Sequence, residues 1–418
     1  MATKLRILAV VEGIYPDAIG GAHTYQYELF RHLAAAGHEV HVVTRRLHAG
    51  DADSELIEGF VVHRCDVPGM ENPLLWRFFA SGACYTMARR ACARFQPDLV
   101  HIFYMHGGLK CARHASQAGL PVVVTCHAPC HEDELVEARG HAKLNPGLRT
   151  LIKSAYLPVS LFEKKRTERK MIKMADTMIL LSDFVRERLI EIHGQHLVNA
   201  WVIPGGVDTN RFKPPKSKAQ AKERLGLPQD RRILLTVRRL VHRMGLENLI
   251  GAMVNVRQIL PDVQLIIGGT GQLKGLLDEQ IRASGLQDCI KLAGFIPNDK
   301  LADYYGAADL FVLPTQELEG FGLVTLEAMA CGTPALGTPV GGTVDLLSGF
   351  DSRCLCPDSS ASGISEGIVR LMSNFRTFQD LTSRTRPFVE NGYSWDRIAD
   401  MVEGVYFDMI RQVSEQCV

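Results

Sequence analysis

The chain has 418 residues, which is long for one domain and sufficient for two, and 46% of them are hydrophobic, so each half can bury a core. Basic and acidic residues number 47 and 46, a formal net charge of +1, without the basic excess of proteins that bind nucleic acid in bulk. No signal-peptide pattern, bilayer-spanning apolar run or disulfide framework is visible, so we expect a cytoplasmic protein whose 11 cysteines are free.

Short apolar runs alternate with longer amphipathic segments through the first half of the chain. Strands are predicted at residues 5–11, 40–44, 60–64, 99–103, 121–126, 177–181 and 200–203. A helix is predicted at residues 22–36, where Leu29, Phe30 and Leu33 share one face and Gly37 follows as the stop. This alternation predicts a parallel sheet with helices on both faces.

The segment 204–215 interrupts that alternation, because it contains Gly205, Gly206, Pro214 and Pro215 and reads as a linker. Alternation resumes with predicted strands at residues 233–237, 263–267, 290–293, 310–313 and 334–337. We therefore expect an α/β protein of two doubly wound domains, at residues 1–204 and 205–392. A C-terminal helix is expected within residues 393–418, and the sequence does not decide which domain it packs on.

The most specific motif follows the predicted strand at residues 310–313. Glu319 lies in a glycine-containing turn, and a helix is predicted to begin near Gly322 or Leu323, with Glu327 inside it. Unpaired N–H groups at a helix start suit a diphosphate, and carboxylates can accept hydrogen bonds from sugar hydroxyls. Ligands of open α/β sheets bind at the carboxyl ends of strands, so we expect a site here.

Three arginines leave the sheet together after the predicted strand at residues 233–237. They are Arg238, Arg239 and Arg243, followed by Met244 and Gly245. Cations at this place would neutralise a diphosphate and stabilise its charge as it leaves.

Two features of the first half add weaker signals. The loop after the first strand ends in Gly20 and Gly21, where backbone N–H groups can approach a phosphate, but it lacks the three-glycine turn of a dinucleotide site. His127 follows the predicted strand at residues 121–126 at its carboxyl end. A lone histidine at a strand end either contacts a ligand or only forms a hydrogen bond with the backbone.

The order of these segments resembles the family-4 glycosyltransferases over nearly the whole chain. That resemblance implies the GT-B architecture, two facing Rossmann-like domains, with the acceptor bound by the first and a nucleotide sugar by the second. It implies that Glu327 holds the ribose and that Glu319 and His127 lie near the transferred sugar. The diphosphate would then be bound by a set of residues from both domains: Arg239, Arg243, Gly20, Gly21, Gly322, Leu323 and Val324. The family usually has a lysine where this chain has Met244, and we expect Arg243 to supply that charge.

The resemblance further implies transfer of a hexosyl residue with retention, from a UDP-sugar or GDP-mannose, with UDP favoured, to a glycan, lipid-linked or small-molecule acceptor. No cofactor and no metal are expected, and Asp51 and Asp53 are interpreted as solvated. Loops such as residues 128–157 are expected to select the acceptor. Other GT-B enzymes, an epimerase or a phosphorylase, and a non-catalytic nucleotide-sugar-binding subunit stay open as alternatives.

One segment carries a charge pattern that the donor site does not explain. The segment Arg149–Lys173 contains eight basic residues, interspersed with apolar groups such as Leu157 and Phe162. Peripheral contact with the inner face of a membrane, an acidic acceptor and a plain solvated helix face are all compatible with the pattern.

Overall fold

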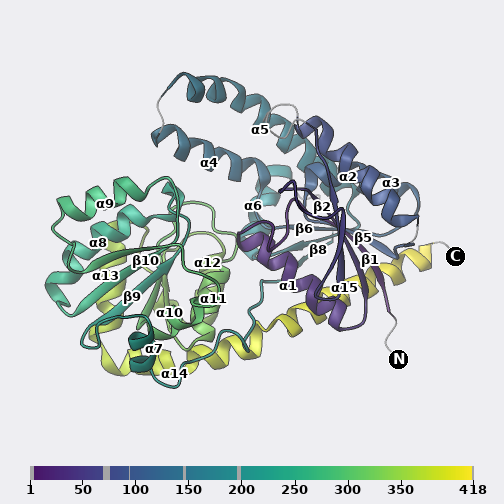
Figure 1. Cartoon of the computed structure of the whole chain (residues 1–418). Coiled ribbons are helices and arrows are strands. Elements are labelled where there is room, and N and C mark those ends of the chain that lie inside the picture. Colours follow the sequence, from purple (N-terminus) through teal and green to yellow (C-terminus); the bar gives the residue numbers. More distant parts are fainter. Residues whose placement is uncertain (1–3, 69–75, 94, 145–146, 195–198, 417–418) are drawn as a thin grey trace. The chain divides into compact units, whose positions relative to one another are not determined.

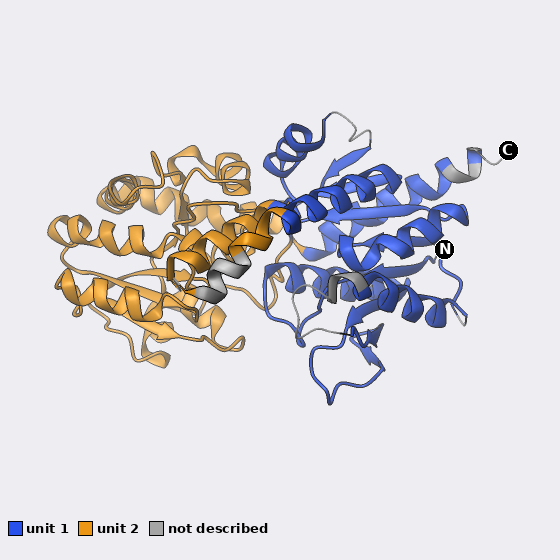
Figure 2. Ribbon diagram, turned by 90° about the horizontal axis from the view of Figure 1, so that it is seen from above, with its two compact units in different colours: residues 1–131, 159–205, 395–418 blue, residues 132–158, 206–394 orange. Residues whose placement is uncertain are grey.

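The computed structural model describes residues 4–68, 76–93, 95–144, 147–194 and 199–416 (Figure 1). The chain divides into two compact units (Figure 2). Residues 1–131, 159–205 and 395–418 form unit 1, and residues 132–158 and 206–394 form unit 2. The change of unit at residue 205 falls within the irregular segment that the sequence marks as a linker.

Unit 1 is built on a twisted, largely parallel sheet. Its strands are β1 (Arg6–Val10), β2 (Glu39–Arg45), β3 (Ser54–Ile57), β4 (Phe60–Cys65), β5 (Leu99–Ile102), β6 (Val122–Cys126), β7 (Thr177–Leu180) and β8 (Ala200–Val202). Their order in the sheet is β3-β4-β2-β1-β5-β6-β7-β8. The inner strands are almost wholly buried, as expected where helices cover both faces of a parallel sheet.

The helices assigned to unit 1 are α1 (Gly21–Ala35), α2 (Trp76–Cys92), α3 (Met105–Gln117), α6 (Asp183–His193) and α15 (Trp395–Gln416). Helix α15 is the C-terminal helix, and the structure shows that it packs on unit 1. The Tyr406 hydroxyl lies 2.6 Å from Nδ1 of the buried His101, and the rings of Trp395 and Tyr25 meet edge to face at 5.3 Å. The tail is therefore an integral helix of unit 1, although it follows unit 2 in the sequence.

Unit 2 contains a smaller sheet in which all described pairings are parallel. Its strands are β9 (Arg232–Val237), β10 (Val263–Gly268), β11 (Ile290–Gly294), β12 (Leu310–Leu313) and β13 (Ala335–Gly337), in the order β11-β10-β9-β12-β13. The surrounding helices are α7 (Lys218–Arg224), α8 (Leu246–Ile259), α9 (Lys274–Ala283), α10 (Leu301–Ala307), α11 (Leu323–Ala330), α12 (Gly342–Phe350), α13 (Ala361–Ser373) and α14 (Phe375–Gly392). The fold class predicted from the sequence, two doubly wound α/β domains, is confirmed.

Two long helices cross from one unit to the other. Helix α4 (Cys130–Leu144) lies almost wholly in unit 2, and α5 (Leu148–Met174) runs from unit 2 into unit 1. The expectation of acceptor-selecting loops at residues 128–157 is wrong in its local structure, because most of this segment is helical. The segment forms helices because most of its residues favour a helix and only a few Gly or Pro residues lie among them.

Every strand expected from the sequence is present, with its ends displaced by no more than one residue. Strand β3 is the addition, and it pairs antiparallel with β4. Its first three residues are exposed, so no alternation of apolar and polar residues marks it as a strand. The turn at Glu58 and Gly59, both at positive φ, allows β3 to fold back onto β4 at the edge of the sheet.

Each sheet has one point where the strand order changes direction. In unit 2 the chain proceeds from β9 outward to β10 and β11, then returns to place β12 on the other side of β9. In unit 1 the same change places β5 beside β1. The loops after the two strands at such a point separate and leave a crevice, where ligands of doubly wound folds bind.

Candidate functional site

The carboxyl ends of β9 and β12 carry a buried ion pair at the switch point of unit 2. Arg238 directly follows β9 and donates from Nη2 to Oε2 of Glu319 at 2.5 Å and from Nη1 to Oγ1 of Thr315 at 2.6 Å. The side chains of Arg238 and Glu319 are only 6% and 13% exposed. Burial by itself would raise the pKa of Glu319, but the charges of Arg238 and Arg243 and the bonds from Arg238 and Thr315 hold that pKa below its ordinary value. Glu319 is therefore a carboxylate that accepts hydrogen bonds.

Arg243 ties the arginine segment to the turn that holds Glu319. Its Nη1 donates to the carbonyl oxygen of Leu318 at 2.9 Å, and its own carbonyl oxygen accepts from the backbone N–H of Gln316 at 2.8 Å. Its side chain is 15% exposed, whereas that of Arg239 is 55% exposed. Arg243 is thus held in place at the strand end, and Arg239 reaches into solvent beside it.

A carboxylate of helix α4 binds both of these arginines. Oε1 of Glu137 lies 2.7 Å from Nη2 of Arg239 and 3.2 Å from Nε of Arg243. Asp133, one turn earlier on the same helix, lies 3.6 Å from Nη2 of Arg243. The cations at this strand end are therefore already engaged by an acidic helix of the same unit.

Helix α11 begins where the Glu319 turn ends, as predicted. Its N-cap is Gly322, at φ 95°, and no side chain caps the helix. The N–H groups of Leu323 and Val324 have no acceptor within the helix, and the helix dipole gives this end a partial positive charge. A helix start with these free N–H groups is suited to an anion such as phosphate.

Glu327 lies one turn into α11 and is half-buried. Its Oε2 accepts a hydrogen bond of 2.7 Å from the hydroxyl of Tyr305, which is fully buried on α10. Burial and the neighbouring Glu327 raise the pKa of Tyr305, so its hydroxyl keeps its proton and fixes the carboxylate.

Two glycines allow neighbouring backbone segments to pack closely at this edge of the sheet. A Cβ on Gly245, at φ 71°, would lie 1.8 Å from the carbonyl oxygen of Pro314, and one on Gly341 would lie 2.1 Å from that of Glu319. Both positions need a glycine because the backbone of the Glu319 turn occupies the space of a side chain.

Met244 is 6% exposed and belongs to the short 3₁₀ turn His242–Met244. An apolar side chain here is packed inside the unit, and the positive charge of the edge comes from arginines. The sequence places Arg238 among the cations of this edge without indicating its partner, and it gives no signal for Thr315. Arg238 was visible as the residue that directly follows a buried strand, but its pairing with Glu319 spans 81 positions and carries no sequence signal.

The switch point of unit 1 has a different character. Gly20 precedes α1, whose start also lacks a side-chain cap. His127 follows β6, and its ring meets that of Tyr25 edge to face at 5.0 Å. In the part of the chain that the structure describes, three buried polar atoms near these residues have no hydrogen-bond partner: Nε2 of His127, Nδ1 of His23 and the hydroxyl of Tyr25. Buried, unpartnered polar atoms are costly, so this cluster is a candidate ligand contact.

His127 is neutral at physiological pH. Burial, with a smaller contribution from His23, lowers its pKa to about 4. A neutral imidazole can donate from one nitrogen and accept at the other, which suits contact with sugar hydroxyls.

The residues proposed from sequence thus fall into two groups. Unit 2 brings together Arg239, Arg243, Glu319, Gly322, Leu323, Val324 and Glu327, and unit 1 holds Gly20, Gly21 and His127. Asp53 pairs with Arg46, and the Asp51 carboxylate accepts from the backbone N–H of His48. Across the described ranges, no group of three or more His, Cys, Asp or Glu side chains is arranged to hold a metal ion.

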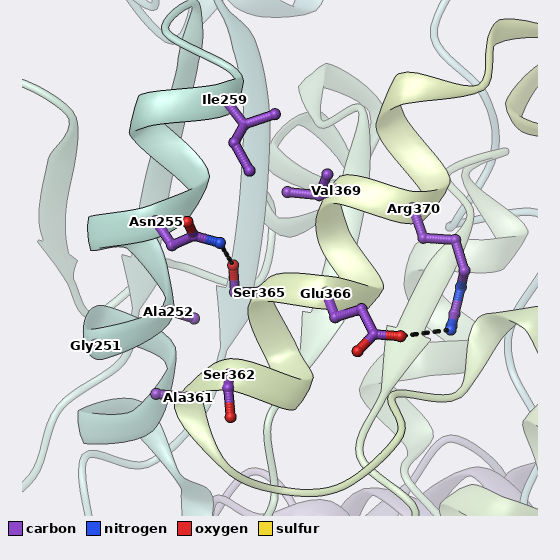
Figure 3. A pocket seen from close by; sticks show the side chains of 10 residues that line it. All are labelled: Gly251, Ala252, Asn255, Ile259, Ala361, Ser362, Ser365, Glu366, Val369 and Arg370. Carbon is purple, nitrogen blue, oxygen red and sulfur yellow. Dashed lines mark hydrogen bonds and ion pairs between the residues drawn. The ribbon is translucent and has the colours of Figure 1, made fainter.

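A groove of about 470 Å³ lies elsewhere in unit 2, between α8 and α13 (Figure 3). Asn255 donates to Ser365 across it at 2.8 Å, and Glu366 faces Arg370 at 3.9 Å. It lies between helix faces and is lined by neither Glu319 nor Glu327. This groove is therefore separate from the strand ends where the predicted site residues lie.

The fold and the strand-end sites define a class of protein, the GT-B glycosyltransferases. Solved structures of that class share the fold. Sucrose-phosphate synthase from Thermosynechococcus elongatus is 24% identical, with a TM-score of 0.78 over 97% of this chain and 100% of that one. Anabaena HepE in complex with UDP and glucose is 19% identical, with a TM-score of 0.72 over 97% and 100% of the two chains.

Sequence comparison gives the family. Residues 19–211 match the description "Glycosyltransferase Family 4", and residues 217–388 match "Glycosyl transferases group 1". A protein of Thermobispora bispora named D-inositol 3-phosphate glycosyltransferase is 31% identical over 77% of this chain and 74% of its own. One of the same name from Nocardiopsis dassonvillei is 31% identical over 82% and 80%. The chain belongs to the family-4 glycosyltransferases and is an enzyme of that class.

Proposed function

We propose that this enzyme transfers a hexosyl residue, with retention, from a UDP-sugar to a hydroxyl group of its acceptor. The observation that carries the proposal is the convergence at one switch point of three arginines, two carboxylates and an uncapped helix start. Arg239, Arg243 and the N–H groups of Leu323 and Val324 would bind the diphosphate, because they are the positive groups of that edge apart from Arg238, which pairs with Glu319.

The two carboxylates would bind the ribose and the sugar of the donor. Glu327, held by Tyr305, would accept from the ribose hydroxyls, and Glu319, held by Arg238, from the sugar hydroxyls. UDP is favoured over GDP because HepE, which shares the fold, is solved in complex with UDP and glucose. GDP-mannose is the alternative donor.

In the proposed reaction, the bond between the anomeric carbon and the phosphate oxygen breaks as the acceptor oxygen bonds to that carbon on the same face. The acceptor proton passes to the leaving phosphate oxygen, so that no protein base is needed. The arginines and the helix start stabilise the charge that develops on the diphosphate, and they take the role that a metal ion plays elsewhere. His127 and the unpartnered atoms beside it would bind hydroxyl groups from unit 1.

The acceptor is proposed by class only: a glycan, a lipid-linked sugar or a small molecule. The names of the two relatives put inositol 3-phosphate among the small molecules to be assayed first.

A thermal-shift panel with UDP, GDP, ADP and NAD⁺ tests the donor. A ligand selective for the folded state stabilises it by ~2.7 kcal/mol at a hundredfold excess over Kd. We expect UDP to raise the Tm of the wild type and to have little effect on Glu327→Ala, which removes the ribose acceptor. Glu223→Ala, an exposed glutamate of α7, is the matched control. A shift with NAD⁺ alone, or an unchanged UDP shift in Glu327→Ala, would contradict the assignment.

A further inference from the structure

The exposed face of α5 in unit 1 carries a stripe of residues that the donor site does not use. Val159, Phe162, Arg166, Arg169 and Lys173 are all exposed and follow one another at spacings of three and four. Residues at that spacing share one face of a helix. We refer to these five residues, with the exposed neighbours Lys165 and Lys170, as the α5 face.

The opposite side of the same helix is packed into unit 1. Glu168 is buried, where it accepts from the backbone N–H of Cys130 at 2.8 Å and lies 3.0 Å from Nδ1 of His131 and 2.9 Å from Nε2 of His193. Met171 is fully buried nearby. These contacts fix the rotation of the helix, so the α5 face is held toward solvent.

The α5 face places exposed apolar side chains next to exposed cations. Phe162 is 67% exposed and Val159 is 50% exposed. The five cations that follow, Lys165, Arg166, Arg169, Lys170 and Lys173, have no ion-pair partner among the residues that the structure describes. The two acidic side chains between residues 159 and 173 are Glu163, which is half-buried, and Glu168, which is buried. The cationic part is therefore an uncompensated positive surface beside an apolar one.

We propose that the α5 face docks this enzyme on the surface of a membrane that contains anionic lipids. Phe162 and Val159 would enter the boundary between headgroups and acyl chains, and the cations would pair with lipid phosphates. The stripe from residue 159 to 173 is about 21 Å long at 1.5 Å per residue, enough to lie along the surface. In the part of the chain that the structure covers, no helix has the length and apolarity to cross a bilayer, so the contact is interfacial.

An acidic polysaccharide would also bind the cations, but it would give no role to the exposed Phe162 and Val159. The apolar pair is therefore the observation that favours a lipid surface over a soluble polyanion. The side chains of residues 148–153, including Arg149 and Lys153, lie outside those described, and the proposal does not use them.

Flotation of the full chain with vesicles tests the proposal. The vesicles are phosphatidylcholine alone, or phosphatidylcholine mixed with phosphatidylglycerol. We expect binding only to the anionic vesicles, and weaker binding at roughly 0.5 M salt, where the screening length falls to a few ångströms. Arg166→Gln/Arg169→Gln should reduce partitioning on the order of tenfold or more. Phe162→Ser should also weaken binding and should do so at both salt concentrations.

Arg89→Gln/Arg90→Gln is the matched control, because it removes two exposed arginines from α2 of the same unit. We expect it to bind as the wild type does, and circular dichroism melts of all variants establish that each is folded. Equal binding to neutral vesicles, no binding to either kind, or loss in the control equal to that in Arg166→Gln/Arg169→Gln would overturn the proposal. Capture by a soluble acidic polysaccharide through the same arginines, without vesicle binding, would replace it with an acidic acceptor.

Discussion

The two switch points of the molecule differ in charge. The strand ends of unit 2 are rich in charge, with Arg238 and Glu319 paired in near burial and Arg239 and Arg243 bound to Glu137. The strand ends of unit 1 present His127, His23 and Tyr25, whose buried polar atoms have no partner among the described residues. Similar sheets thus present different groups, and the proposed function uses this difference: charged groups for a diphosphate, and neutral donors and acceptors for hydroxyls.

The strongest test of this contrast removes the buried cation of unit 2. Arg238→Met leaves the buried Glu319 carboxylate without its ion-pair partner, so we expect a loss of ~3–5 kcal/mol in the free energy of unfolding and a severe loss of turnover. Glu319, whose pKa is held down by Arg238, should then take up a proton at higher pH. Urea titrations and steady-state kinetics measure the two effects.

A double variant separates stability from chemistry at this pair. Arg238→Met/Glu319→Leu replaces both charges by apolar groups, and we expect it to recover much of the stability but none of the activity. Wild-type turnover in Arg238→Met would show that the pair has no part in the reaction.

The next effect concerns the exposed arginine beside the pair. Arg239→Ala should raise the activation free energy of turnover by ~2–4 kcal/mol and weaken the binding of UDP, because a cation of the proposed diphosphate site is lost. Calorimetry with UDP and initial-rate kinetics are the measurements. Arg257→Ala, which breaks an exposed pair with Asp288 in the same unit, should change neither.

A smaller effect is expected in unit 1. His127→Ala should reduce kcat/KM about tenfold, corresponding to one hydrogen bond to a neutral group. Because the pKa of His127 is about 4, this residue is uncharged from well below neutral pH upward, and the rate profile of the wild type should contain no step from it between pH 6 and 8. The exposed His114 of α3 supplies the control variant, His114→Ala. A wild-type step that vanishes only in His127→Ala would show that this histidine titrates near neutral pH.

The smallest effect is a gain. Glu137→Gln keeps the shape of the side chain but removes the charge that competes with a diphosphate for Arg239 and Arg243. Since Glu137 is 37% exposed, we expect an increase in UDP affinity of only a few-fold, corresponding to ~1 kcal/mol or less, and smaller at high salt. Glu366→Gln, in an exposed pair on α13, is the control. A decrease in affinity would indicate that Glu137 positions the arginines rather than competing for them.

Local patterns in the sequence were enough to predict the strands and the start of α11. Buried parallel strands read as continuous apolar runs, and Gly322 marks a helix start by a backbone conformation that glycine readily adopts. Strand β3 was not predicted because an exposed edge strand carries no such pattern. The prediction of loops at residues 128–157 was wrong because most residues of this segment favour a helix.

The sequence by itself therefore determined the fold class, the linker near residue 205 and the family, because each depends on neighbours within a few positions or on a motif, and it proposed the residues of the donor site. Only the tertiary structure decided which groups meet across long separations. It paired Arg238 with Glu319, engaged Glu137 with two arginines, packed α15 into unit 1 and turned the α5 face outward. These outcomes depend on burial and on the energy of compensating charges in three dimensions, which neither spacing nor composition encodes.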